Sequence, residues 1–209
     1  MRLLLAGATG LVGGHVLALA LADRRVSAVA APVRRELPAH PKLLAPVVDF
    51  ENLPEIAAWW RADAAICAIG TTIAKAGSQE AFRRVDHGHA LAIARAARAH
   101  GTPAFVLNSA ASANATSRIF YSRVKGETER DIENLRFESL TIVRPGLIGG
   151  ERSESRPGES IAKVVLGALG PILPRALRIN PPETIARAML DAAIAGRPGR
   201  HVIGAAELN

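Results

Sequence analysis

Tyr121 and Lys125 are the pair of side chains in this sequence best suited to acid–base chemistry. Tyr121 is the only tyrosine among 209 residues, and Lys125 follows it at position i+4. On a helix such residues lie on one face, so the ammonium group would lie beside the phenol. A neighbouring positive charge favours the phenolate and lowers the tyrosine pKa, which would make Tyr121 a usable acid or base near neutral pH.

Ser109 lies upstream of this pair, directly after an apolar segment that is typical of a strand. Its hydroxyl could hold a substrate carbonyl or alcohol beside Tyr121. A tyrosine and a lysine at this spacing also occur on the solvent face of amphipathic helices, and that alternative stays open here. The position of Ser109 before the helix favours a catalytic group of Ser109, Tyr121 and Lys125.

A glycine-rich turn near the N-terminus supplies a second chemical signal. Residues 7–13 read G-x-x-G-x-x-G, directly after an apolar run and at the start of a helical segment. The first glycine would allow a tight turn, the second a close approach to a pyrophosphate, and the third close packing of helix on strand. Free N–H groups at the helix start would bind the phosphates. The cofactor contacts predicted in this turn are Gly7, Thr9, Gly10, Leu11, Val12 and Gly13. The alternative is a glycine-rich turn without a ligand.

Arg34 and Arg35 indicate which dinucleotide the turn would bind. NAD-binding units usually end their second strand with Asp or Glu, which holds the ribose 2′-hydroxyl. Here no carboxylate appears before Glu36, and the two arginines stand in that region. A guanidinium can bond phosphate oxygens in pairs, so NADP(H) is predicted in preference to NAD(H), unless both arginines are ordinary surface charges. Asp49 and Phe50 follow the third expected strand and would either meet the adenine edge or simply end that strand.

Together these features resemble the short-chain dehydrogenase/reductase superfamily, in its atypical, NAD(P)H-binding branch. Within that branch the chain is similar to the Tat-interacting oxidoreductase-like proteins. The segments that carry this likeness run over nearly the whole chain: Gly70-Thr71-Thr72, Lys75-Ala76-Gly77, Arg84-Val85-Asp86, Val124-Lys125-Gly126-Glu127, Arg144-Pro145-Gly146, Ser155-Arg156-Pro157-Gly158-Glu159 and Arg187-Ala188-Met189-Leu190.

The resemblance implies roles for the residues that match. Tyr121 would be the acid/base, Lys125 would lower its pKa and bond the nicotinamide ribose, and Ser109 would position the substrate. Further implied cofactor contacts are Gly70 and Thr71 after the fourth strand, and Pro145 and Gly146 beside the nicotinamide amide.

Asp86 marks a departure from the pattern of the superfamily. Many relatives carry Asn on the long helix, where it supports the lysine, and Asp86 takes that place here. A carboxylate at this position would hold Lys125 too firmly or join a proton relay.

The elements that must position these residues alternate along the chain. Strands are expected at residues 2–6, 26–31, 47–48, 64–69, 104–107, 139–143 and 201–203, and helices at 11–23, 54–61, 78–100, 117–135, 161–169 and 183–195. Ser78 would cap the long helix, and Gly101 would follow its last turn. Strands that are apolar on both faces predict an α/β fold, a Rossmann-type doubly wound parallel sheet.

The rhythm of strands and helices breaks after Pro145, where Gly and Pro become frequent. We therefore expect one domain over residues 1–209. Residues 1–145 would form its nucleotide-binding core, and residues 146–209 a small substrate-side lobe over the C-terminal edge of the sheet.

Composition limits the classes of protein that the chain could belong to. Hydrophobic residues make up 49% and aromatic residues only 4%, which fits helices on a parallel sheet better than an aromatic-rich β-sandwich. The single cysteine, Cys67, excludes an internal disulfide framework and a cysteine-based zinc site. Its apolar neighbours indicate a buried, inert thiol. The six histidines are scattered, so no metal is expected.

The net charge of +7 lacks the long basic runs and interleaved aromatic residues that would favour a nucleic-acid partner. The apolar run at residues 3–6 is too short for a signal peptide or a membrane span. With its lone thiol, the chain is therefore expected to be cytoplasmic and away from membranes.

Three functions fit these features. The first is an NADP(H)-dependent oxidoreductase that transfers hydride to or from a small carbonyl or alcohol substrate, with Tyr121 handling the proton. The second is a non-catalytic redox sensor that binds NADPH and a protein partner. The third is a nucleotide-sugar epimerase or dehydratase, although the short substrate lobe weighs against it.

Overall fold

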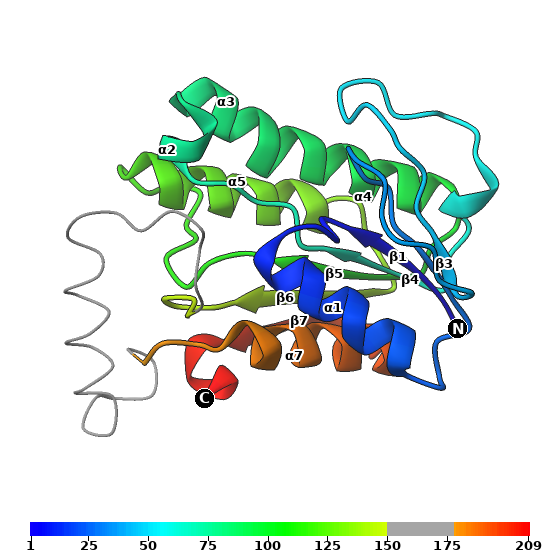
Figure 1. The fold of residues 1–209 in the computed structure, drawn as a ribbon. Coiled ribbons are helices and arrows are strands. Elements are labelled where there is room, and N and C mark those ends of the chain that lie inside the picture. Colours follow the sequence, from blue (N-terminus) through cyan, green and yellow to red (C-terminus); the bar gives the residue numbers. More distant parts are fainter. Residues whose placement is uncertain (150–177) are drawn as a thin grey trace.

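The computed structural model describes residues 1–149 and 178–209, which contain a seven-stranded parallel sheet (Figure 1). The strand order is β3-β2-β1-β4-β5-β6-β7. The strands are β1 (Arg2–Ala6), β2 (Ala28–Ala30), β3 (Leu43–Leu44), β4 (Ala64–Cys67), β5 (Ala104–Asn108), β6 (Ser139–Arg144) and β7 (Gly199–Gly204). The predicted Rossmann-type α/β fold is confirmed. The strand order reverses between β1 and β4, and ligands of such sheets bind outside the carboxyl ends of the strands at this point.

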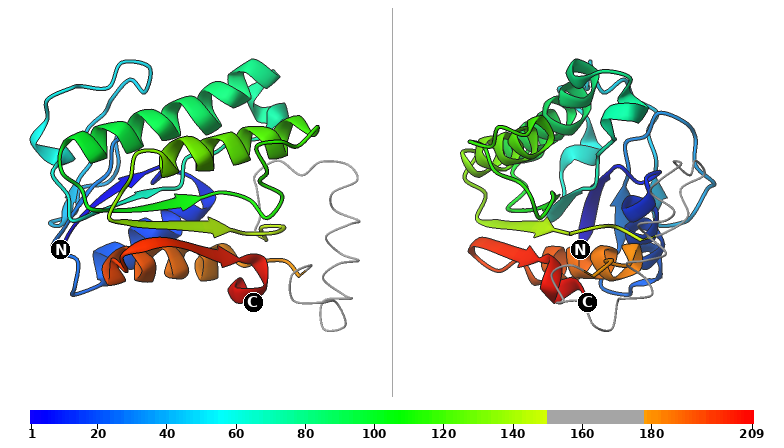
Figure 2. Two further views of the ribbon diagram at one scale, coloured as in Figure 1. Left: turned by 180° about the vertical axis from the view of Figure 1, so that it is seen from behind. Right: turned by 90° about the vertical axis from the view of Figure 1, so that its left-hand side faces the viewer.

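Helices cover both faces of the sheet (Figures 1 and 2). On one face lie α1 (Leu11–Ala22) and α7 (Pro182–Ala195). On the other lie α3 (Gln79–Arg83), the π-helical turn η2 (Arg84–His89), α4 (Ala90–Ala99) and α5 (Phe120–Glu133). Shorter elements are α2 (Ile73–Ala76) and the 3-10 turns η1 (Ala58–Trp60) and η4 (Ala205–Leu208). None of the helices in the described ranges is long and apolar enough to cross a membrane.

The core consists of two apolar layers, one on each face of the sheet. Leu3 and Leu5 join the layer that α1 and α7 cover, and Leu4 joins the layer that α4 and α5 cover. All three leucines are fully buried, and burying one such side chain stabilises the fold by about 1.5–3 kcal/mol. Burial of β1 on both faces therefore fixes the position of the glycine turn that follows it.

The edge strand lies earlier than the sequence predicted. Instead of residues 47–48, β3 is Leu43–Leu44, and Val47 forms only an isolated bridge with Val33. Pro46 has no N–H to donate and interrupts the ladder between these two segments. Leu44 and Val47 are both more than half exposed, so burial does not decide the register at this edge.

The helix expected at residues 54–61 is also wrong. Only the single turn η1 forms there. Trp60 is fully buried, and its Nε1 donates a hydrogen bond to the carbonyl oxygen of Pro54 at 2.8 Å. This contact folds the segment back as a loop, which a continuous helix would not allow.

The long helix expected at residues 78–100 forms, with the predicted ends. The Ser78 side chain accepts a hydrogen bond from the Ala81 N–H, and Gly101 follows with φ of +81°. Its middle, however, is the π-helical turn η2. Such turns shift the side-chain register of a helix and are frequent at functional sites.

The C-terminal part of the chain contributes to the same sheet. β7 pairs with β6 along its whole length, and α7 packs beside α1. These elements confirm the strand expected at 201–203 and the helix expected at 183–195. The helix expected at 161–169 lies outside the described residues, and the division of the domain at residue 145 stays a prediction.

Candidate active site

The backbone of the turn between β1 and α1 is closely packed. A side chain on either of two of its glycines would force neighbouring backbone atoms to move. Gly7 has φ of +90°, and a Cβ on it would lie 2.6 Å from the Ala68 carbonyl carbon. A Cβ on Gly13 would lie 2.0 Å from the Gly7 oxygen. α1 therefore rests directly on the turn, as the spacing of the glycines predicted.

The start of α1 is open to an anion. Within the part of the chain that the structure describes, no side chain caps this helix, and its first turn holds no acidic residue. Thr9 and Gly10 are exposed and Leu11 is half-buried, whereas Val12 is 5% exposed and belongs to the core. Free N–H groups with a partial positive charge fit a phosphate. Val12 could offer a ligand only its backbone.

Lys125 forms a buried ion pair with Asp86 across the space between α5 and η2. Lys125 Nζ lies 2.6 Å from Asp86 Oδ1, and the other carboxylate oxygen accepts a hydrogen bond from the Thr71 N–H at 2.8 Å. A Cβ on Gly70 would lie 3.8 Å from Lys125 Nζ. The structure thus brings Gly70, Thr71 and Lys125 together just beyond the carboxyl end of β4.

The Lys125 ammonium is held in its charged form. Burial alone would disfavour the charge, but the carboxylate of Asp86 and the nearby Tyr121 outweigh it and raise the pKa of Lys125. A buried ammonium with its carboxylate at contact distance keeps its proton throughout the neutral range.

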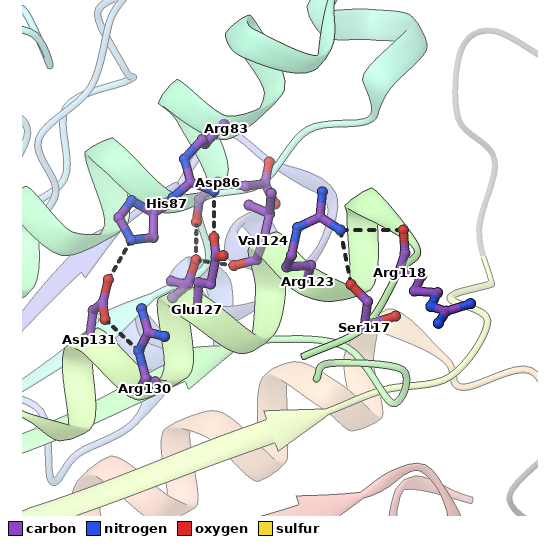
Figure 3. Close-up of polar contacts among 11 residues, drawn as sticks. Arg83, Asp86, His87, Ser117, Arg118, Arg123, Val124, Glu127, Arg130 and Asp131 are labelled. Atoms are coloured by element: carbon purple, nitrogen blue, oxygen red, sulfur yellow. Dashed lines mark hydrogen bonds and ion pairs between the residues drawn. The ribbon is translucent and has the colours of Figure 1, made fainter. Parts of the chain in front are cut away.

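A row of polar contacts joins η2 and the last residue of α3 to α5 (Figure 3). His87 Nε2 lies 2.8 Å from Asp131 Oδ2, and Arg83 pairs with Glu127. Between these pairs the Thr128 hydroxyl donates to the Val124 backbone oxygen of its own helix at 2.8 Å and also lies 3.3 Å from the backbone oxygen of Asp86. The contacts lie alongside the Asp86–Lys125 pair and fix the spacing between its two helices.

Tyr121 lies one turn before Lys125 on α5, and the start of this helix lies at the carboxyl edge of the sheet (Figure 1). The helix begins at Phe120, so Tyr121 is in its first turn. The ring is half-buried and contacts Phe82 of α3 at a centroid distance of 5.6 Å. The same-face arrangement of Tyr121 and Lys125 follows from their helical spacing.

The Ser109 side chain does not contact Tyr121, the residue beside which it was predicted to act. It is 6% exposed, and its hydroxyl donates a hydrogen bond to Glu129 of α5, not to Tyr121. Glu129 is itself 4% exposed and pairs with Arg144, whose Nε donates to Glu129 Oε1 at 3.0 Å. The group Ser109–Glu129–Arg144, hereafter the buried clamp, was missed at the sequence level. One signal was present, because Glu129 is one further helical turn along the face of Tyr121 and Lys125.

The predicted adenine contacts have other partners. The Asp49 carboxylate accepts hydrogen bonds from the Glu51 N–H at 2.9 Å and the Asn52 amide at 2.8 Å, and the first of these chiefly lowers the pKa of Asp49. Phe50 lies 5.6 Å from the ring of His89. Arg34 and Arg35 are exposed beyond the end of β2.

The predicted contacts after β6 are tied into the backbone. The Pro145 carbonyl accepts a hydrogen bond from the Ala111 N–H at 2.8 Å. The Gly146 N–H donates to Asn180 Oδ1 at 2.7 Å, and Asn180 is fully buried. Backbone groups at these two positions therefore fix the loop after β6, and a ligand would have to use the remaining polar atoms.

Asn108 adds a polar atom that sequence reasoning did not single out. Its Oδ1 is buried at the carboxyl end of β5 and has no hydrogen-bond partner in the described ranges. A buried acceptor without a donor is costly, so a bound ligand that offers an N–H or O–H fits here. Cys67 is inert by contrast, since burial raises the pKa of its thiol to about 11. Among residues 1–149 and 178–209 no three His, Cys, Asp or Glu are grouped to hold a metal ion.

Three comparisons show which known proteins the chain is similar to. The model of a family described as NAD(P)H-binding matches residues 7–167. Protein fmp52, mitochondrial, from Emericella nidulans is 38% identical over 80% of this chain and 76% of that protein, and protein HTATIP2 from Rattus norvegicus is 37% identical over 93% and 81%. The structure of MoeE5 in complex with UDP-glucose and NAD has a TM-score of 0.73 at 17% identity, and the match covers 98% of this chain and 76% of that one.

The name of the fungal relative overturns the cytoplasmic prediction, because that protein is named mitochondrial. The prediction was based on a lone buried thiol and on an apolar N-terminal run that is too short for a signal peptide. That run is β1, a buried interior strand of the sheet between β2 and β4. Its composition reflects burial and carries no information about compartment.

Proposed function

The chain belongs to the NAD(P)H-binding family, and on that premise we propose that it is an oxidoreductase that uses NADP(H) in preference to NAD(H). Its substrate would be a small carbonyl compound or the corresponding alcohol. The observation that carries the proposal is the buried Lys125 ammonium, which lies one helical turn from Tyr121 and beside Gly70. It lies at the carboxyl edge of the sheet, where the glycine turn after β1 also lies.

The chain offers groups that fit such a cofactor. The uncapped N–H groups of α1 suit its pyrophosphate, and Arg34 and Arg35 are exposed where a 2′-phosphate would need them. Lys125 would bond the nicotinamide ribose, and the unpaired Asn108 Oδ1 would accept one further hydrogen bond. When bound, the nicotinamide supplies the hydride or accepts it.

Tyr121 would supply or accept the proton of the reaction at its phenolic oxygen. In reduction it protonates the oxygen that develops negative charge on the substrate, and in oxidation it removes the hydroxyl proton. Lys125, held in its charged form by Asp86, stabilises the phenolate in both directions. The Ser109 hydroxyl, which the sequence pattern assigned to the substrate, is bonded to Glu129 in this structure.

The cofactor preference is tested by a fluorescence titration of the purified chain with NADPH and with NADH. We expect NADPH to bind at least ~10-fold tighter, about 1.4 kcal/mol. Arg34→Ala should remove most of this preference by weakening NADPH binding alone, because only NADPH carries the 2′-phosphate.

Arg61→Ala is the matched control, since it removes the same charge from an exposed site at the amino end of β4, the opposite edge of the sheet. It should leave the preference unchanged. Equal or tighter NADH binding by the unaltered chain would contradict the preference, and binding of neither cofactor would overturn the proposed function.

The role of Asp86 predicts a pH dependence that appears only when the carboxylate is removed. In the unaltered chain the raised pKa of Lys125 keeps the ammonium charged, so NADPH affinity should be flat from about pH 7 to about pH 9.5. In Asp86→Asn the buried amine loses its counter-charge and its pKa falls, because burial now dominates. NADPH affinity should then decline roughly 10-fold as the pH rises over that range.

Asp131→Asn serves as the control for this titration. It removes a carboxylate from the same interface, but one that pairs with His87 and not with Lys125. Its profile should remain flat above neutral pH. A flat profile for Asp86→Asn, with NADPH still bound, would mean that Lys125 keeps its charge without Asp86.

A further inference from the structure

We propose that Ser112, on the loop between β5 and α5, is the hydroxyl that contacts the substrate, and that the buried clamp holds this loop in place. The inference deepens the proposed function and rests on it. It assigns to Ser112 the contact that the sequence pattern assigned to Ser109.

The buried clamp commits Ser109 to a structural contact. Its side chain is almost completely shielded from solvent, and its proton is donated to Glu129. The Glu129 carboxylate is in turn held by Arg144 with charge-assisted hydrogen bonds, which are stronger than neutral ones. Turning the Ser109 hydroxyl toward a substrate would leave a buried carboxylate with one donor fewer.

Ser112 lies on a stretch of loop that is fixed on both sides. Before it, the Ala111 N–H donates to the carbonyl of Pro145, at the position predicted to approach the nicotinamide. After it, the Asn114 N–H donates to the backbone oxygen of Ser122 at 2.9 Å, directly beside Tyr121. Ser112 is therefore held between the two parts of the site that the reaction needs.

The loop also lies directly against the helix of Tyr121 and Lys125. A Cβ on Gly126 would lie 2.1 Å from the Ala115 backbone nitrogen, so only glycine allows this approach. The contact is made at the residue that follows Lys125. Small movements of α5 and of this loop are thus coupled, which would keep Ser112 in register with Tyr121.

Ser112 carries the polar side chain between the two fixed points of the loop, Ala111 and Asn114. It is exposed, and its hydroxyl has no hydrogen-bond partner among the described residues. Asn114 is used within the loop, since its Oδ1 accepts from both the N–H and the hydroxyl of Thr116, at 3.0 and 2.9 Å. A serine hydroxyl can donate to a carbonyl oxygen or accept from an alcohol, so Ser112 suits either direction of the reaction.

Cysteine labelling tests the placement of Ser112 without a substrate. The native Cys67 is fully buried and burial raises the pKa of its thiol to about 11, so a new cysteine supplies the reactive thiol. With iodoacetamide, Ser112→Cys should be alkylated readily, and saturating NADPH should slow the reaction several-fold. Ser109→Cys should react slowly with or without NADPH. An alkylation rate at position 112 that bound NADPH does not change, or faster labelling at position 109, would overturn the proposal.

Alanine variants test the role of each hydroxyl in turnover. Ser112→Ala should lower kcat/KM for an NADPH-dependent carbonyl reduction by about 10-fold, the loss of one hydrogen bond, with unchanged Tm and NADPH affinity. Ser112→Thr should restore most of the lost kcat/KM.

Ser109→Ala should lower Tm, because it removes a hydrogen-bond donor from the buried Glu129 carboxylate. The assignment is wrong if Ser112→Ala is fully active while Ser109→Ala loses activity at unchanged Tm. If the unaltered chain binds NADPH but reduces no carbonyl compound, the proposed function fails, whereas the labelling result still decides where Ser112 lies.

Discussion

Tyr121→Phe is expected to lower NADPH-dependent turnover by about 10²–10⁴-fold, the usual contribution of a positioned acid or base. The change removes one oxygen atom and keeps the ring, so the contact with Phe82 at 5.6 Å is retained. NADPH affinity should stay nearly the same, because Lys125 and Asp86 still form their buried pair. The measurement is NADPH oxidation with a panel of small aldehydes and ketones, followed by full kinetics on the best one.

A neighbouring aromatic provides the control for this variant. Phe120 also contacts Phe82, at a centroid distance of 6.0 Å, and Phe120→Leu perturbs the same aromatic cluster without touching the phenol. This variant should stay within a few-fold of the unaltered chain in turnover. If Tyr121→Phe kept comparable activity on the same substrate, another group would have to supply the proton.

The family and the fold followed from the sequence because several local signals agreed. Buried leucines, a glycine turn and a helical segment succeed each other from residue 2, and β1 and α1 begin where they were expected. The match to the NAD(P)H-binding family confirms the resemblance seen in the motifs. The edge strand β3 could not be placed in the same way, since Leu44 is more than half exposed and the register of the strand depends on the hydrogen bonds to β2.

The candidate site was only partly predictable. Helical spacing gave the common face of Tyr121 and Lys125, whereas the turn η2 depends on contacts with α5 that are remote in sequence. The orientation of the Ser109 side chain, in contrast, could have been predicted from the sequence. Phe105 and Leu107 belong to the apolar layer under α4 and α5, and by strand alternation Ser109 points the same way. The buried clamp therefore follows from applying the period of two through the end of β5.

Gly13→Ala is expected to destabilise the folded state by about 3 kcal/mol or more, because the added methyl group meets backbone and not a flexible side chain. Its Cβ would lie 2.0 Å from the Gly7 oxygen and 2.7 Å from the Gly7 carbonyl carbon. The Gly7 backbone cannot move away from the new methyl group, since it is itself packed against the backbone of Ala68. Urea unfolding followed by circular dichroism measures the loss, and NADPH titration of whatever fold remains should show weakened binding.

Gly14→Ala is the matched control, one position further along the same helix. There the nearest atom to a new Cβ is the Ala8 oxygen at 3.7 Å, an ordinary contact. Alanine should stabilise this helix by about 0.5–1 kcal/mol relative to glycine, since less backbone entropy is lost on folding. A loss of stability at position 13 and a gain at position 14 would separate the effect of contact with the turn from the effect of helix propensity. If both variants were equally stable, α1 would not rest on the Gly7 carbonyl, and the phosphate site at its first turn would lose its structural basis.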